Sequence, residues 1–206
     1  MKKTAILLLL ALLLTAFTGC GYYSDAEANE IISDLLIREA DLNGYIYGSA
    51  FKTEEDPGDD VDSDYQKYYK VAPDSKYITL ASLVSEVDSL IVSTSREGIY
   101  EYAFEGVTDE TSASYPPRFA ENADGTLEIN VADHMYSLRT KALLGSAKVL
   151  RSNPTHIKAK ITVYRFTADG TPIEAEKEME LRVEDGQWRL VNQTMIIGVL
   201  EEAPVK

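Results

Sequence analysis

The first half of the chain spaces its apolar residues as an amphipathic α-helix does. Ser24 precedes acidic residues in a first turn, which is typical of an N-cap, and Asn43-Gly44 provides a C-terminal stop. The pattern predicts a helix from Ser24 to about Asn43. The apolar residues expected on its buried face are Ile31, Leu35 and Leu36.

Two further helices are predicted before residue 106. The segment Ile78–Ile91 repeats apolar residues every three or four positions. In the segment Thr94–Phe104, Thr94 and Glu97 have the spacing of a capping box, and Gly106 is placed to end the helix.

The second half changes to the alternation of β-strands. Arg118–Val131 predicts a hairpin around Ala123-Asp124-Gly125, and Lys141–Leu150 predicts a further strand after the segment Asp133–Arg139. The expected fold class is α+β, with N-terminal helices packed on a curved antiparallel β-meander.

The strands Thr155–Phe166 and Ile173–Val183 carry their apolar residues at odd positions. A shared buried face then requires odd positions to pair with odd ones, across a loop with an odd number of residues. Three residues at Ala168-Asp169-Gly170, with a glycine bulge, satisfy this. The charged residues that the register brings together on the outward face are Lys158, Lys160, Glu178 and Glu180.

The last turn, Asp185-Gly186, predicts a two-residue type I′ hairpin. It brings Trp188 opposite Val183, so Trp188 is expected to anchor the core rather than to bind a ligand. Lys177 interrupts the apolar stripe of its strand, which indicates the edge of the sheet or the rim of a cleft.

The N-terminus has the three parts of an export signal. Lys2 and Lys3 form a charged region, an apolar stretch runs from Ala5 to Phe17, and small residues follow. The apolar stretch has 13 residues, whereas a helix that crosses the hydrocarbon core of a membrane needs about 20. Residues 1–19 are therefore predicted to be a removable signal peptide.

The residues Phe17-Thr18-Gly19-Cys20 resemble the lipobox recognised by lipoprotein signal peptidase, with Phe17 in place of the usual leucine. Cys20 is the only cysteine, so it has no partner for an internal disulfide, and acylation would remove an exposed thiol. The resemblance implies lipidation of Cys20 and an extracytoplasmic location on the cell membrane. A secreted form cut elsewhere and an uncleaved anchor are the alternatives.

We expect residues 20–25 to form the lipidated N-terminus and a short tether, residues 26–200 a single α+β domain, and residues 201–206 a C-terminal tail. Removing Lys2 and Lys3 from the 20 basic side chains leaves 18 against 34 acidic ones, a formal charge of −16. This charge disfavours nucleic acid and broad contact with anionic lipid, and it favours encounter with a basic protein.

The segment Thr53–Asp64 is acidic and interrupted by proline and glycine, which predicts a loop. Its alternating aspartates do not fit an EF-hand, because Tyr65 and Val71 fall where glycine and glutamate are required, so no metal site is predicted. Carboxylates beside tyrosines suit a contact surface. The predicted partner-binding residues are Asp60, Asp62, Asp64, Tyr65, Tyr68 and Tyr69.

No set of residues indicates catalysis. His134 and His156 lack metal-ligand spacing, and we expect His156 to face water and His134 to cap or to lie at the surface. The sequence has neither a nucleophile elbow nor a phosphate-binding loop. It therefore favours a non-enzymatic protein without a cofactor.

The order of elements resembles the NTF2-like, cystatin-like α+β superfamily, and more closely small extracytoplasmic lipoproteins of Gram-positive bacteria, with a distant similarity to inhibitors of cell-wall DL-endopeptidases. The residues that carry the resemblance are Tyr69-Lys70-Val71, Tyr77-Ile78-Thr79-Leu80, Phe104-Glu105-Gly106, Arg118-Phe119 and Trp188-Arg189-Leu190.

The predicted tether, the acidic charge and the missing catalytic set favour a protein that binds another protein or an envelope component, through the concave side of its sheet and the acidic loop. The resemblance, together with the charge, implies one specific version, inhibition of a basic cell-wall hydrolase. One alternative is an NTF2-like pocket that binds or acts on a small molecule, which a deep cavity containing Asp133 or His134 would favour. The other is a purely structural envelope protein with no specific ligand.

Overall fold

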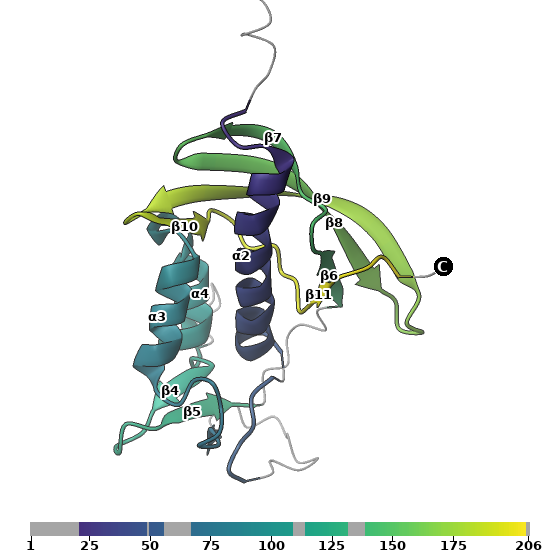
Figure 1. Cartoon of the computed structure of the whole chain (residues 1–206). Coiled ribbons are helices and arrows are strands. Elements are labelled where there is room, and N and C mark those ends of the chain that lie inside the picture. The colour runs from purple at the N-terminus through teal and green to yellow at the C-terminus, as the bar shows by residue number, and fades with distance from the viewer. Residues whose placement is uncertain (1–20, 49, 56–66, 109–113, 132–138, 205–206) are drawn as a thin grey trace, which may run out of the picture.

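The computed structural model describes residues 21–48, 50–55, 67–108, 114–131 and 139–204, and these ranges form a mixed α+β structure (Figure 1). Their three α-helices lie beside a largely antiparallel main sheet. A small sheet, which contains β4 (Phe119–Glu121) and β5 (Leu127–Asn130), lies at one end of the helices. This end is the one farther from strands β7 (Lys148–Asn153), β9 (Pro172–Glu184) and β10 (Gln187–Leu190) of the main sheet (Figure 1). The predicted α+β class is confirmed.

Helix α2 (Asp25–Ile46) begins where the sequence predicts, with Ser24 as its N-cap in a capping box. The helix continues through Asn43-Gly44, so its predicted end was wrong. Tyr45 and Ile46 are 8% and 0% exposed. Burying these two side chains stabilises the last helical turn by more than Gly44 destabilises it.

Helix α3 (Leu80–Leu90) lies within its predicted segment and is capped by Thr79. The next helix is formed by α4 (Glu97–Tyr100) and a single wider turn, η2 (Glu101–Glu105), which ends at Gly106 as predicted. Gly106 has a φ of +82°, a conformation that favours glycine.

The predicted capping box at Thr94 was wrong. Thr94 lies inside the short 3₁₀ turn η1 (Ser93–Ser95), and α4 begins without a side-chain cap. Arg96 occupies the N-cap position because its guanidinium group donates hydrogen bonds to the carbonyl oxygens of Asp88 and Ile91, which fixes the connection from α3.

The main sheet of the described residues has six strands in the order β10-β9-β8-β6-β11, and β7 also pairs with β8. Their bounds are β6 (Thr140–Leu143), β7 (Lys148–Asn153), β8 (His156–Phe166), β9 (Pro172–Glu184), β10 (Gln187–Leu190) and β11 (Val199–Leu200). The pair β6–β11 is parallel, so the expected meander is not entirely antiparallel. The C-terminal segment returns across the sheet to reach β6.

The single strand predicted at Lys141–Leu150 is divided in two. β6 and β7 occupy successive stretches of the same side of β8, separated by a turn in which Gly145 has a φ of +72°. Ser146 fills the gap, because its hydroxyl accepts from the Thr162 N–H at 2.9 Å and donates to the Leu143 carbonyl oxygen at 2.6 Å.

The β8–β9 hairpin confirms the predicted parity, since Ile157 lies opposite Leu181. Residues 168–170 form the predicted loop inside a backbone hydrogen bond between Thr167 and Thr171, with Gly170 at a φ of +83°. The hydrophobic pattern therefore specified the correct register.

The charged ladder on the outward face is also confirmed. Lys158 bonds to Glu178 at 2.7 Å, and Lys160 reaches Glu176 at 2.9 Å. Ile173 and Ala175 were expected in the core but are exposed. They lie toward the end of the hairpin, which extends beyond the helices (Figure 1).

The turn at Asp185-Gly186 has φ values of +54° and +76°, as a type I′ turn requires, and Trp188 lies opposite Val183. Trp188 is half-buried and packs against the core, so its expected anchoring role is confirmed. Lys177 lies on β9 beyond the end of β10, which confirms the expected edge position.

The small sheet has the order β1-β5-β4 and contains the predicted hairpin, with Gly125 at a φ of +83° in its turn. Its strands are β1 (Tyr68–Lys70), β4 (Phe119–Glu121) and β5 (Leu127–Asn130), and a separate pair is formed by β2 (Val107–Thr108) and β3 (Ser114–Tyr115). The main core lies between the helices and the inner face of the large sheet. Residues at its centre are Ile32, Leu36, Leu83, Ile157 and Leu181, each at most 1% exposed.

Candidate functional site

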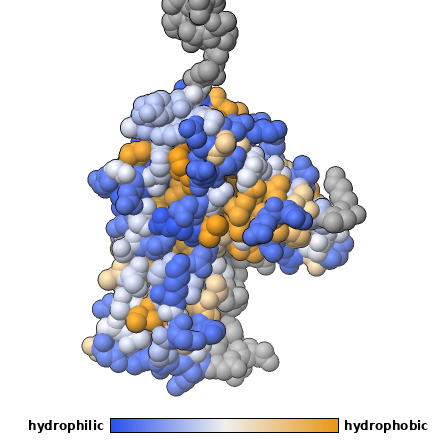
Figure 2. Space-filling model, viewed as in Figure 1, coloured by the Kyte–Doolittle hydropathy of each residue, from blue (hydrophilic) through white to orange (hydrophobic). Residues whose placement is uncertain are grey.

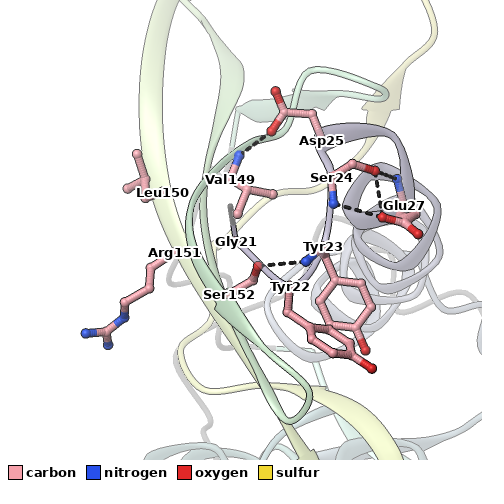
Figure 3. Close-up of a pocket in the computed structure, with 10 residues that line it drawn as sticks. All are labelled: Gly21, Tyr22, Tyr23, Ser24, Asp25, Glu27, Val149, Leu150, Arg151 and Ser152. Atoms are coloured by element: carbon pink, nitrogen blue, oxygen red, sulfur yellow. Dashed lines mark hydrogen bonds between the residues drawn. The ribbon is translucent and has the colours of Figure 1, made fainter. Parts of the chain in front are cut away.

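Cys20, the predicted lipidation site, lies outside the described residues, which begin at Gly21. From Gly21 to Ser24 the chain runs beside β7 (Figure 3). The N–H of Tyr22 donates to the Ser152 carbonyl oxygen at 3.4 Å, and the N–H of Tyr23 donates to Ser152 Oγ at 2.9 Å. The segment predicted to be a tether is therefore held directly against the sheet.

The start of α2 is joined to the same edge of the sheet. Asp25 accepts a hydrogen bond from the Val149 N–H at 2.7 Å. One turn later, the Asn29 side chain accepts from the Ala147 N–H at 2.8 Å and donates to the Ala147 carbonyl oxygen at 3.0 Å. These side chains take the place of a neighbouring strand, so they satisfy backbone groups at the break between β6 and β7.

Aromatic side chains continue this contact into the core. The rings of Tyr22 and Tyr23 meet edge to face at 4.9 Å, and Tyr23 meets Trp188 in the same geometry at 5.6 Å. Trp188 therefore joins the N-terminal segment to the sheet as well as filling space. We name residues 21–25 the anchoring segment.

A surface hollow of about 640 Å³ lies between the anchoring segment and β7. Its lining residues are Gly21, Tyr22, Tyr23, Ser24, Asp25, Glu27, Val149, Leu150, Arg151 and Ser152 (Figure 3). Hydrogen bonds from Ser24, the backbone N–H first, lower the pKa of Glu27. Glu27 therefore stays ionised, and the carboxylates of Asp25 and Glu27 each already accept a backbone N–H hydrogen bond. These two carboxylates hold the chain in place rather than supply a proton.

The sequence reasoning missed Tyr23, Asn29 and Ser152. The available signal was the aromatic pair Tyr22-Tyr23, which begins two residues after Cys20, because a free tether has no need of large apolar side chains. The partners on β7 are more than a hundred residues away in the chain, and no local pattern connects them.

The predicted partner-binding residues are only partly described. Asp60, Asp62, Asp64 and Tyr65 lie outside the described residues. Tyr69 is 7% exposed and belongs to the core, so its predicted role in a contact surface was wrong. Alternation along β1 turns Tyr69 inward and leaves Tyr68 half-buried.

Tyr68 remains beside a second surface hollow of about 230 Å³, which is also lined by Glu54, Glu55, Lys67, Tyr69, Lys70 and Glu128. Its hydroxyl donates to the Pro117 carbonyl oxygen at 2.5 Å, and burial raises the pKa of Tyr68. The acidic and aromatic character expected near the loop is therefore present on the small sheet, at the end of the molecule far from the anchoring segment (Figure 1).

His134 and Asp133 lie outside the described residues. His156 was expected to face water, but its side chain is only 17% exposed and its Nε2 lies 2.8 Å from Glu180 Oε1. The pairing follows from the same register that forms the lysine ladder, since His156 and Glu180 both lie on the outward face. His156 is thus part of the charged face rather than free.

A buried polar cluster on α2 was not predicted. Glu39 and Asn43 are both 0% exposed. Glu39 accepts hydrogen bonds from the backbone N–H and the hydroxyl of Thr194, and Asn43 donates to the Ile196 carbonyl oxygen at 2.9 Å. Burial raises the pKa of Glu39, although hydrogen bonds from Thr194 oppose the shift.

The described ranges contain no group of three histidine, cysteine or acidic residues arranged to hold a metal ion. Within the same ranges, no helix has both the length and the apolar character needed to cross a membrane. Figure 2 shows a mainly hydrophilic lower end around β4 and β5, whereas hydrophobic side chains gather over the region of β6, β8 and β11. Leu144 and Val199 are half-buried residues of that region.

Comparison with known proteins gives no relationship from which to infer an activity. No protein-family model matches the chain, and no curated protein matches it significantly.

Proposed function

We propose that this chain is an extracytoplasmic lipoprotein, anchored to the cell membrane through acylated Cys20, and that its folded part is a non-enzymatic binding module for a protein or envelope component. The finer fold that we propose is NTF2-like or cystatin-like. The resemblance of residues 17–20 to a lipobox is the sequence basis of the anchor.

The observation that best supports the proposal is the short distance along the chain between the lipobox-like residues and the first residues held against the fold. Hydrogen bonds to β7 begin at Tyr22, two residues after Cys20. Lipid on Cys20 therefore holds the folded body directly at the bilayer, and each buried methylene adds about 0.8 kcal/mol of affinity. The small sheet, at the far end of the molecule, faces away from the membrane in this arrangement (Figure 1).

Mass spectrometry of the N-terminal peptide and membrane fractionation test the anchor. We expect a diacylglycerol-modified Cys20 at the new N-terminus and recovery of the protein with membranes. The matched variant Cys20→Ala should carry no lipid and should accumulate as the uncleaved precursor. An unmodified Cys20 in the mature wild-type protein contradicts the proposal.

The concave side of the main sheet, where we expected binding, is filled by buried core residues, so that prediction was wrong. The binding surface is proposed instead at the small sheet, together with the acidic segment Thr53–Asp64. Glu54, Glu55 and Glu128 lie beside Tyr68 and outnumber the two lysines of the same hollow, and the mature chain has a formal charge of −16. Such a surface attracts a basic partner and gives binding that weakens with salt. Inhibition of a basic cell-wall hydrolase is the specific version that we propose.

Peptidoglycan hydrolysis followed by turbidity tests this version. We expect the protein to slow a basic hydrolase at low salt and to lose the effect at high salt. The variant Glu54→Lys/Glu55→Lys should inhibit less. Glu97→Lys/Glu101→Lys, at two exposed positions of α4 and η2, changes the charge by the same amount and serves as the control. Unchanged hydrolysis at low salt excludes inhibition of that hydrolase.

The small-molecule alternative has less support. The inner face of the main sheet is filled by Met179 and Leu190, which are 1% and 0% exposed, and half-buried Phe104 and Trp188 pack against the same core. A filled core leaves little room for a ligand, and this favours a docking surface.

A further inference from the structure

The edge of the sheet nearest Cys20 differs in charge from the rest of this acidic protein. β7 carries Lys148 and Arg151, and the register sets them opposite Lys160 and Lys158. Four basic side chains therefore lie on one face of two adjacent strands. Like charges directly opposite each other on a sheet cost stability, so this arrangement needs a compensating anion.

Of these four basic side chains, only the two lysines of β8 form direct ion pairs within the part of the chain that the structure describes. The pKa of Glu176, lowered mainly by its hydrogen bond with Lys160, is also lowered by a weaker charge interaction with Lys148. Lys158 and Lys160 form ion pairs with Glu178 and Glu176. Among the described residues, Lys148 and Arg151 form no ion pair, and both are exposed. The two basic residues of β7 are thus available to an external anion.

An exposed apolar side chain lies between these two charges. The pairing of β7 shifts between Val149 and Arg151, so Leu150 has no opposite residue and is 49% exposed. Leu150 and Arg151 extend outward from β7, away from the anchoring segment (Figure 3). Apolar and basic side chains side by side are typical of surfaces that lie in a lipid headgroup region.

The covalent chain fixes how far this edge is from the lipid anchor. One residue separates Cys20 from Tyr22, so their Cα atoms are at most about 7.6 Å apart. Tyr22 is in turn hydrogen-bonded to Ser152 on β7. Acyl chains on Cys20 therefore bring β7 to the bilayer surface.

We propose that Lys148, Leu150 and Arg151 of β7 form a second membrane contact, in which Leu150 enters the interfacial region and the two basic residues bind phosphates of anionic phospholipids. This inference rests on the proposed lipoprotein function. A formal charge of −16 opposes broad contact with anionic lipid, so the contact is confined to this edge. It orients the small sheet away from the membrane.

Site-specific fluorescence on the acylated protein tests the contact. Because acylation blocks Cys20, Leu150→Cys provides a single reactive thiol in the mature chain, which is labelled with an environment-sensitive dye after purification from membranes. The matched control is Ile78→Cys, where Ile78 is 47% exposed next to the small sheet at the far end. Both proteins are reconstituted in vesicles of phosphatidylglycerol and phosphatidylcholine that contain spin-labelled lipid.

We expect strong quenching and a blue shift at position 150 and neither at position 78. Adding Lys148→Glu and Arg151→Glu to the labelled Leu150→Cys protein should reduce the quenching while the protein still floats with the vesicles. Equal, weak quenching at both positions in floating protein overturns the contact and leaves the lipid anchor intact. If quenching at position 150 is equally strong in vesicles of pure phosphatidylcholine, the proposed recognition of anionic phospholipids is overturned. Acylated protein that does not float with vesicles overturns the lipoprotein function itself.

Discussion

Glu39 on α2 accepts hydrogen bonds from both the backbone N–H and the hydroxyl of Thr194, a residue 155 positions later in the chain. Both residues are 0% exposed. The next residue, Met195, has a φ of +55°, and its N–H donates to the same carboxylate at 3.3 Å. One carboxylate thus holds the C-terminal segment on α2 in a conformation that non-glycine residues rarely adopt.

Removing the Glu39 carboxylate should destabilise the fold. Glu39→Ala leaves the buried N–H of Thr194 without an acceptor, and we expect the free energy of unfolding to fall by about 2–4 kcal/mol. Glu39→Gln keeps an oxygen for that N–H and should cost much less. Urea denaturation of both variants provides the measurement, and equal losses for the two would contradict the role of the hydrogen bonds.

The pH dependence of stability should carry the signature of Glu39. Burial raises its pKa above the usual 4.5 in the folded state. Its stabilising contribution is therefore complete below pH 4.5 and is lost as the pH rises through the folded-state pKa. The free energy of unfolding of the wild type, relative to Glu39→Gln, should fall from pH 4 to 7. A flat difference across this range would show that Glu39 has an ordinary pKa.

Glu184 should behave in the opposite way. Hydrogen bonds from the Ser93 hydroxyl and N–H, with Arg189 adding to them, lower the pKa of Glu184 to about 2. Its contribution is therefore present above pH 4.5 and is lost as the pH falls toward 2. As the pH falls from 4.5 toward 2, the free energy of unfolding should decrease less in Glu184→Gln than in the wild type. Glu174→Gln, at an exposed position of β9, serves as the control.

Gly106 should be the least replaceable of the turn glycines. A Cβ at Gly106 would lie 2.7 Å from the Tyr115 carbonyl oxygen, and its φ of +82° is unfavourable for other residues. We expect Gly106→Ala to lower the free energy of unfolding by about 2–3 kcal/mol. Gly125→Ala is the matched control, because Gly125 has a φ of +83° but open space around it, and should cost about 1 kcal/mol. Equal losses in urea denaturation would exclude a steric contribution at Gly106.

The contact between the anchoring segment and β7 should depend on Gly21. A Cβ there would lie 2.7 Å from Ser152 Oγ, the acceptor for the Tyr23 N–H. We expect Gly21→Ala to speed hydrogen exchange at the Tyr23 amide with little change in Tm, because the contact lies at the surface. Ser152→Ala removes the same acceptor and should give the same local effect. Unchanged exchange in both variants would show that this hydrogen bond does not hold the segment.

Local chemistry explains why several elements were predictable. The start of α2 depends on the capping side chain of Ser24, and the β9–β10 turn depends on an Asp185-Gly186 pair that tolerates positive φ. The register of the β8–β9 hairpin follows from the parity of the apolar positions together with the three-residue loop at residues 168–170. Each of these signals lies within a few residues of the structure that it specifies.

The same reasoning failed where distant segments compete with local preference. Gly44 reads as a helix end, but Tyr45 and Ile46 are buried against the core and extend α2. Asn29 supports the gap between β6 and β7, which reads as one strand in the sequence. Tyr69 reads as part of an exposed aromatic cluster, and only its position on β1 turns it inward.

The sequence by itself determined the α+β class, the capped start of α2 and the register of the long hairpin, and it predicts the lipid anchor at Cys20. These properties depend on residue spacing and on turn and cap chemistry, which act over short stretches of chain. Only the tertiary structure decided that the anchoring segment is bound to β7 and that Glu39 is buried beneath Thr194. Those contacts join residues more than a hundred positions apart, and whether a polar side chain meets water or a partner depends on which distant segment packs over it.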